Sequence, residues 1–208
     1  TVNGIPREKL YPYGIPVDES FYTSMSKFEA RNAVAREFGW DIPLFNNWFL
    51  IMTGSMGFGN TQEIIDETIR QSLDGTEIIA VCGRNEEMLN RLKEENRYLP
   101  NIHPVGFTDR IPLLMDACDV LFTKPGGISS TEAMSKHIPM IHTAPIPGCE
   151  TRNAEFFHYH GMSYSCIDTV QQVKTALRLC EDMEYRKTMT GAQQFNAKPD
   201  TCHDIYAL

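Results

Sequence analysis

The sequence of 208 residues has no long hydrophobic run and no excess of basic residues. A helix that crosses a bilayer needs about 20 consecutive apolar residues, and no window approaches this length. The N-terminus also lacks the basic and then apolar pattern of a secretory signal peptide. The formal net charge of -8 disfavours long-range attraction to nucleic acid or to an anionic membrane surface. We therefore expect a soluble, cytoplasmic domain that binds no nucleic acid.

The six cysteines and six histidines show no metal-binding pattern. There is no CxxC pair and no zinc-like clustering of cysteine with histidine. His142, His158 and His160 lack the spacing of metal ligands on a helix, and we interpret them as surface or capping histidines. We expect free thiols in a reducing compartment, and we predict no metal site.

What the sequence does contain is an alternation of strand-like and helix-like segments. The run NWFLIM at 47–52 is typical of a strand buried on both faces, and Gly39 stands where the helix before it would end. Such alternation favours an α/β fold, a Rossmann-like doubly wound parallel sheet with ligands at the carboxyl ends of the strands. The expected helices are 24–38, 61–73, 86–96, 110–117, 129–136, 153–160, 169–183 and 184–195, and the expected strands are 47–52, 77–82, 102–106, 120–123, 140–143 and 162–165.

The most informative stretch runs from Thr123 to Asn153 and contains two glycine-rich turns. The first turn leads into Ser129, Ser130 and Thr131, which we interpret as helix-capping hydroxyls, and then into Glu132. Backbone N–H groups at a helix N-terminus suit a phosphate, and a carboxylate beside them can accept hydrogen bonds from ribose hydroxyls. A nucleotide fits both, although a helix cap without a ligand gives the same pattern.

Glycines at 54, 57 and 59, after the first strand, are spaced unlike a dinucleotide-binding motif. A dinucleotide site also requires an acidic residue at the end of the second strand, where this chain has Cys82, Gly83, Arg84 and Asn85. NAD is therefore disfavoured. The turn at 54–59 either presents backbone N–H groups to a ligand or uses glycine for its backbone angles alone.

The strings TKPGGISSTEA and MIHTAPIPGCETRNAEFF resemble the sugar-nucleotide half of bacterial diacylglycerol glucosyltransferases and plant-type monogalactosyldiacylglycerol synthases, with MurG-like glycosyltransferases as more distant relatives. The resemblance covers most of residues 4–198 and implies the C-terminal half of a GT-B glycosyltransferase. One departure is Cys149, which stands where the family has Gln and is a weaker hydrogen-bond partner.

The resemblance implies that Glu132 binds the ribose hydroxyls and Glu150 the hexose hydroxyls. The backbone of Phe107 and Thr108 is expected to meet uracil, and Arg84 the phosphates. A solvated arginine and a core phenylalanine are the alternatives at those positions. The full set of expected nucleotide-sugar-binding residues is Gly54, Ser55, Met56, Gly57, Arg84, Asn85, Phe107, Thr108, Gly126, Gly127, Ser129, Ser130, Thr131, Glu132, Pro147, Gly148, Cys149, Glu150 and Asn153.

The implied reaction is transfer of a hexose from UDP-glucose or UDP-galactose to diacylglycerol or a glycosyldiacylglycerol. The resemblance implies no cofactor and no metal, because helix N-termini and backbone amides stabilise the departing UDP. It places the general base and the lipid acceptor on an N-terminal domain, and the whole enzyme at the inner face of the cell membrane as a peripheral protein. We therefore expect no catalytic residue in this chain and no turnover by it alone.

The resemblance also suggests domain limits. Residues 1–20 are expected to be an interdomain linker or a remnant of the N-terminal domain, since the chain begins as a fragment would. Residues 21–198 are the nucleotide-sugar-binding domain, and 199–208 are a C-terminal tail. A MurG-like UDP-N-acetylglucosamine transferase, a UDP-N-acetylglucosamine epimerase and a non-catalytic nucleotide-binding module remain alternatives.

Overall fold

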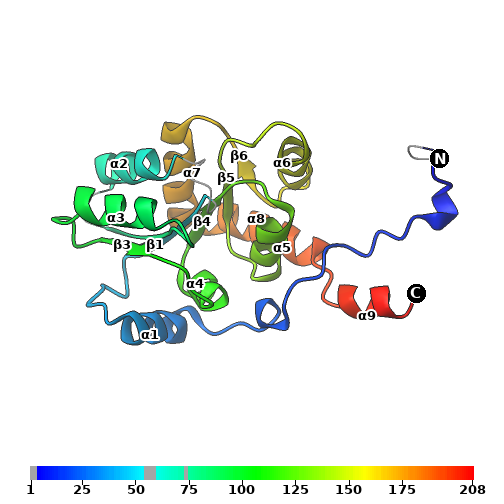
Figure 1. Ribbon diagram of the computed structural model, residues 1–208, viewed down its shortest axis with the longest axis horizontal. Coiled ribbons are helices and arrows are strands. Elements are labelled where there is room, and N and C mark those ends of the chain that lie inside the picture. Colours follow the sequence, from blue (N-terminus) through cyan, green and yellow to red (C-terminus); the bar gives the residue numbers. More distant parts are fainter. Residues whose placement is uncertain (1–3, 54–59, 73–74) are drawn as a thin grey trace.

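The computed structural model describes residues 4–53, 60–72 and 75–208. Within these residues, six parallel strands form one sheet in the order β3-β2-β1-β4-β5-β6 (Figure 1). This is the strand order of a doubly wound sheet, so the predicted fold class is confirmed. The strands are β1 Asn47–Met52, β2 Thr76–Val81, β3 Ile102–Val105, β4 Val120–Thr123, β5 Met140–His142 and β6 Tyr164–Ser165.

Helices cover both faces of the sheet. The helices are α1 Lys27–Phe38, α2 Thr61–Gln71, α3 Glu86–Glu95, α4 Ile111–Ala117, α5 Gly127–Ser135, α6 Cys149–Tyr159, α7 Thr169–Glu181, α8 Met183–Asn196 and α9 Thr201–Tyr206. Figure 1 shows α2, α3 and α7 on one side and α1 and α4 on the other. Because neighbouring strand residues point to opposite faces, Trp48 and Leu50 pack with α1 and α4, whereas Phe49 and Ile51 pack with α2 and α7.

Helix α1 shows how local sequence sets the limits of an element. Ser26 and Glu29 form a capping box at its N-terminus. Gly39 ends the helix with a φ of 68°, a left-handed conformation that glycine adopts without steric cost. The predicted C-cap is confirmed, while the helix begins at Lys27 rather than at residue 24.

The two helices of the motif that resembles glycosyltransferases begin earlier than predicted. Helix α5 begins at Gly127 and α6 at Cys149, rather than at 129 and 153. Gly126 and Gly148 are their N-caps, and neither helix has a side-chain cap. The prediction that hydroxyls cap α5 is therefore wrong, since Ser129 and the residues after it lie inside the helix.

The terminal segments pack on the sheet domain and on each other. Two short 3-10 helices, η1 Arg7–Lys9 and η2 Glu19–Phe21, lie in the N-terminal segment, where Val17 and Phe21 are buried in the core. The hydroxyl of Thr201 in α9 donates to the Tyr13 carbonyl at 2.7 Å. The stretch 199–208, predicted as a tail, thus contains a helix, and the proposed domain limits stay a prediction.

Across the described ranges, no helix combines the length and the apolar character that a bilayer crossing requires.

Candidate functional site

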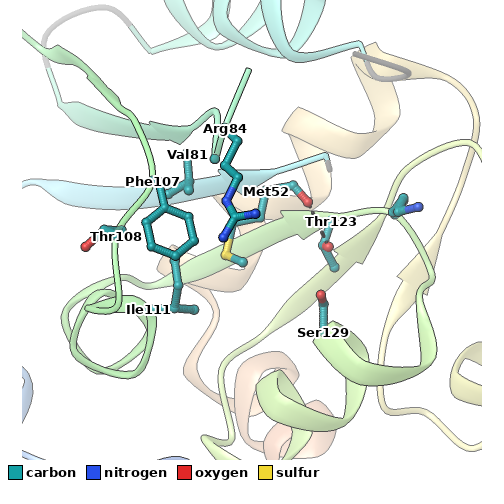
Figure 2. A pocket seen from close by; sticks show the side chains of 10 residues that line it. Met52, Val81, Arg84, Phe107, Thr108, Ile111, Thr123 and Ser129 are labelled. Atoms are coloured by element: carbon teal, nitrogen blue, oxygen red, sulfur yellow. Dashed lines mark hydrogen bonds between the residues drawn. The ribbon is translucent and has the colours of Figure 1, made fainter. Parts of the chain in front are cut away.

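A cavity of about 400 Å³ opens at the carboxyl edge of the sheet, where the parallel strands β1 and β4 pair and the order of the strands reverses. Met52 and Thr123, the last residues of these strands, face each other in register, and the Thr123 hydroxyl donates to the Met52 carbonyl at 2.9 Å. Figure 2 shows the walls converging from the segments after β2, β3 and β4. Ligands of doubly wound folds bind at this switch point. The lining residues are Met52, Val81, Gly83, Arg84, Phe107, Thr108, Ile111, Thr123, Lys124 and Ser129.

Four of the predicted site residues line this cavity together, namely Arg84, Phe107, Thr108 and Ser129. The Arg84 guanidinium lies over the Phe107 ring, 5.1 Å from its centroid (Figure 2). Phe107 is 69% exposed, so the alternative that it is a core phenylalanine is wrong. An exposed ring and a cation on one wall suit a planar base and an anionic group. The predicted Gly54, Ser55, Met56 and Gly57 lie outside the described residues.

Other predicted residues have structural partners of their own. Asn85 is the N-cap of α3, where its side-chain carbonyl oxygen accepts from the Met88 N–H at 2.9 Å. The Thr131 hydroxyl donates to the Gly127 carbonyl at 2.7 Å. Ser130 is fully buried, so the structure does not bring its hydroxyl into the cavity. Sequence reasoning overestimated how many hydroxyls of α5 are open to a ligand.

Glu132 differs from these residues. It lies one turn after Ser129 on the same face of α5, and its carboxylate makes no hydrogen bond and no ion pair with the described residues. Partial burial raises the pKa of its carboxyl, and the nearby Asp18 raises it further. A half-buried carboxylate without a partner is costly for the folded protein, and hydroxyl donors of a ligand would satisfy it.

The N-terminus of α5 supplies positive potential beside this carboxylate. The first N–H groups of a helix lack intrahelical acceptors and point out of its end. Gly126 has room for a side chain, whereas a Cβ on Gly127 would come within 3.1 Å of the Ile15 Cδ1 atom. A side chain at position 127 would therefore require the exposed Ile15 side chain to shift by a few tenths of an ångström.

The second glycine-rich turn folds back onto the first. Gly148 has a φ of 117°, which favours glycine, and it follows Pro147 at the start of α6. The Asn153 side-chain amide donates to the Pro125 carbonyl at 3.0 Å and so joins α6 to the turn before α5. Cys149, the first residue of α6, is exposed. The predicted convergence of the turns after β4 and β5 is confirmed.

Glu150 has partners that the sequence did not indicate. Its Oε1 atom lies 2.8 Å from the Lys124 Nζ atom, and its Oε2 atom accepts from the Ile146 N–H at 2.9 Å. Partial burial alone would raise the pKa of Glu150, but the hydrogen bonds from Lys124 and Ile146 outweigh it and lower the pKa. Lys124 was missed as a site residue, although its place directly after a buried strand is a usable signal.

His142 is not a surface or capping histidine, and that prediction is wrong. The side chain is fully buried at the end of β5. Its Nε2 atom lies 3.0 Å from the Ser130 hydroxyl, and its Nδ1 atom lies 3.1 Å from the Ser163 hydroxyl. Burial, aided by the nearby His158, lowers the pKa of His142 to about 4. A neutral imidazole thus ties β5 to α5.

Because the pKa of His142 is lower in the folded chain than its usual 6.5, stability should fall in acid. Below pH 6.5 the unfolded chain binds a proton that the folded chain excludes until about pH 4. Between pH 7.5 and pH 5.5 we expect His142 to account for a loss of about 1.4 kcal/mol in the free energy of unfolding. Urea unfolding at both pH values measures this loss.

His142→Asn should lose less stability than the wild-type chain over this interval, by about the same 1.4 kcal/mol. His203→Asn is the control, since that side chain is 82% exposed. An equal loss for the wild type and His142→Asn would contradict the assignment.

Within residues 4–53, 60–72 and 75–208 no group of three or more His, Cys, Asp or Glu side chains is placed to hold a metal ion. All six cysteines fall in these ranges and are free. The polar groups at the cavity are instead a guanidinium, an ammonium, hydroxyls and a helix N-terminus. Such groups can hold an anion with hydroxyls beside it.

Comparison with known proteins relates the chain to glycosyltransferases. No protein-family model matches it. It is 26% identical over 181 residues to a processive diacylglycerol beta-glucosyltransferase of Staphylococcus carnosus, covering 86% of this chain and 44% of that protein. It is 31% identical over 164 residues to that of Staphylococcus saprophyticus, covering 76% of this chain and 39% of that protein. The chain thus spans less than half the length of the curated relatives that it matches.

Solved structures share the fold. Alr3699/HepE of Anabaena, in complex with UDP-glucose, superimposes with a TM-score of 0.67 at 17% identity, over 92% of this chain and 56% of that one. MurG of Acinetobacter baumannii gives 0.66 at 17% identity, over 89% and 53%. The fold is therefore that of one half of a GT-B glycosyltransferase, and the relationship to diacylglycerol glucosyltransferases is confirmed.

Proposed function

We propose that this chain, a relative of the processive diacylglycerol beta-glucosyltransferases, is the donor-binding domain of a hexosyltransferase that uses a UDP-sugar. The observation that carries the proposal is the cavity at the switch point. It combines the exposed Phe107, the Arg84 cation and the N-terminus of α5, and Glu132 has no partner one turn along that helix. Its volume of about 400 Å³ lies in the usual range of small-molecule sites.

The parts of a UDP-sugar have counterparts along this edge. Uracil lies at Phe107 and Thr108, and the backbone groups of these two residues form hydrogen bonds with the edge of the base. The ribose hydroxyls donate to Glu132, and the diphosphate lies at the N-terminus of α5. The hexose extends to the turn that carries Glu150. The structure supports this order because β3, β4 and β5 deliver the three segments at one sheet edge.

The chemistry that we propose for this domain is stabilisation of the departing UDP. N–H groups at the end of α5 and the Arg84 guanidinium hold negative charge on the diphosphate without a metal or cofactor. The names of the relatives support diacylglycerol or a glycosyldiacylglycerol as the acceptor of the whole enzyme, which would then act as a peripheral protein at the inner face of the cell membrane. We assign no general base to the described residues.

Calorimetric titration with UDP, UDP-glucose, UDP-galactose, UDP-N-acetylglucosamine and NAD tests the proposal. We expect UDP and at least one UDP-hexose to bind, NAD not to bind, and the affinities to be equal in EDTA and in magnesium chloride. Binding of NAD but not UDP would overturn the proposal. Tighter binding of UDP-N-acetylglucosamine than of either UDP-hexose would favour a MurG-like transferase or an epimerase instead.

A further inference from the structure

Lys124 and Glu150 form an ion pair between the two turns of the candidate site. The ammonium follows directly after β4, and the carboxylate lies in the first turn of α6. The two charged atoms are 2.8 Å apart, and the side chains are 29% and 15% exposed. Because both side chains are partly shielded from water, the attraction lies in the upper range for a partly exposed pair.

Glu150 has both oxygens engaged in the unliganded chain. One oxygen holds Lys124, and the other accepts from the Ile146 N–H, which closes the turn over Gly148. The carboxylate that we assign to the hexose is therefore occupied before the donor arrives. A hexose hydroxyl can compete for it fully only when one of these partners leaves.

Of the two partners of Glu150, Lys124 is the one that can turn toward another anion. Within the described part of the chain, the charged residues of the cavity wall are Arg84 and Lys124. An ammonium on a flexible stem has three donors and can turn toward a nearby anion. The Ile146 N–H, in contrast, is fixed in the backbone of the turn. A diphosphate at the N-terminus of α5 would therefore compete with Glu150 for Lys124.

We propose that the Lys124–Glu150 pair is a clasp that the diphosphate opens. The proposal rests on the function proposed above. The diphosphate draws the Lys124 ammonium away from Glu150, and the freed oxygen of Glu150 accepts a hydroxyl of the hexose. UDP alone breaks the pair without replacing it, whereas a UDP-hexose replaces the lost partner of Glu150. Lys124 is thus a positioning residue that makes recognition of the sugar depend on the diphosphate.

The clasp predicts opposite effects of one substitution on two ligands. Glu150→Gln leaves Lys124 without its ion-pair partner, so UDP should bind about fivefold tighter, the upper range for a partly exposed pair. The advantage of UDP-glucose over UDP should fall by about tenfold, because an amide is a weaker acceptor for a hydroxyl than a carboxylate. Calorimetric titration of the whole chain with UDP and UDP-glucose measures both ratios.

The Lys124→Met background separates the clasp from simple repulsion between Glu150 and the diphosphate. The clasp predicts that Glu150→Gln no longer tightens UDP binding once Lys124 is replaced. Repulsion predicts the same tightening in both backgrounds, and that result would overturn the clasp. Glu155→Gln is the matched control, an exposed glutamate on the same helix, and should leave both affinities unchanged.

Two further outcomes distinguish failure of the clasp from failure of the proposed function. If the wild-type chain binds UDP but Glu150→Gln binds it no tighter, the clasp is wrong and the proposed function stands. If the wild-type chain binds neither UDP nor a UDP-sugar, the proposed function fails and the clasp fails with it. Circular dichroism confirms that each variant is folded before it is titrated.

Discussion

Glu132→Gln is expected to weaken the binding of UDP and of UDP-sugars by roughly 10- to 150-fold, which corresponds to about 1.5–3 kcal/mol. The carboxylate has no hydrogen bond or ion pair among the described residues, so two ribose hydroxyls would be its first partners. An amide oxygen accepts such bonds more weakly because it carries no charge. Calorimetric titration with UDP gives the affinity, and an unchanged value would remove Glu132 from the site.

The same substitution should make the unliganded protein more stable at pH 7. Burial and Asp18 raise the pKa of Glu132 above 4.5, so the folded chain holds this proton more tightly than the unfolded chain does. Stability is therefore lost as pH rises from 4.5 through the folded pKa, and the penalty persists at neutral pH. Glutamine has no charge to bury and avoids the penalty.

Urea unfolding of the wild type and Glu132→Gln at pH 7 and pH 4 measures this effect. The variant should unfold at higher urea at pH 7, and the difference should shrink at pH 4, where the carboxyl is mostly protonated in both states. Glu155→Gln, at an exposed position on α6, should change neither stability nor affinity. A variant that binds UDP weakly and is also less stable would show damage to the fold rather than loss of a ligand contact.

Asp119→Asn is expected to lower the free energy of unfolding by about 3–5 kcal/mol. Asp119 precedes β4 and accepts from the Arg31 guanidinium at 2.5 Å, the Lys27 ammonium at 2.5 Å and the Trp48 N–H at 2.8 Å. The Arg31 side chain is only 7% exposed, so the substitution leaves a buried cation without its counter-ion. A domain of ordinary stability, about 5–15 kcal/mol, would lose a large share of it.

Urea unfolding followed by tryptophan fluorescence tests this prediction, since the Trp48 side chain is fully buried in the folded chain and becomes exposed on unfolding. Asp109→Asn is the control, because that carboxylate is 83% exposed and lies 3.6 Å from Arg110. The control should change stability by less than about 0.5 kcal/mol. A loss below about 1 kcal/mol for Asp119→Asn would mean that water or another group compensates the Arg31 charge.

The fold class was predictable because its signals are local. Apolar strand runs and the helical spacing between them specify elements one at a time, and parallel strands then bring their carboxyl ends to one edge. The boundaries of α5 and α6 were not predictable in the same way. Hydroxyls near Gly127 match a capping pattern, yet Ser130 bonds to His142 instead of the backbone, because packing against β5 takes precedence.

Within the site, the sequence indicated which residue types meet the ligand edge but not which of them already have partners. Glu132 and Glu150 are both glutamates near the start of a helix, yet the Glu132 carboxylate has no partner among the described residues, whereas the Glu150 carboxylate binds the Lys124 ammonium and the Ile146 N–H. The pKa of the first is raised and that of the second is lowered. This difference comes from neighbours that other elements supply.

By itself the sequence determined the strand and helix alternation, the positions of the glycine-rich turns and the relationship to glycosyltransferases. The tertiary structure alone decided that Phe107 is exposed beside Arg84, that His142 is buried and neutral, and that Lys124 pairs with Glu150. The physical reason is that propensities and turn geometry act over a few residues, whereas burial, charge pairing and pKa depend on contacts between segments that only chain folding brings together.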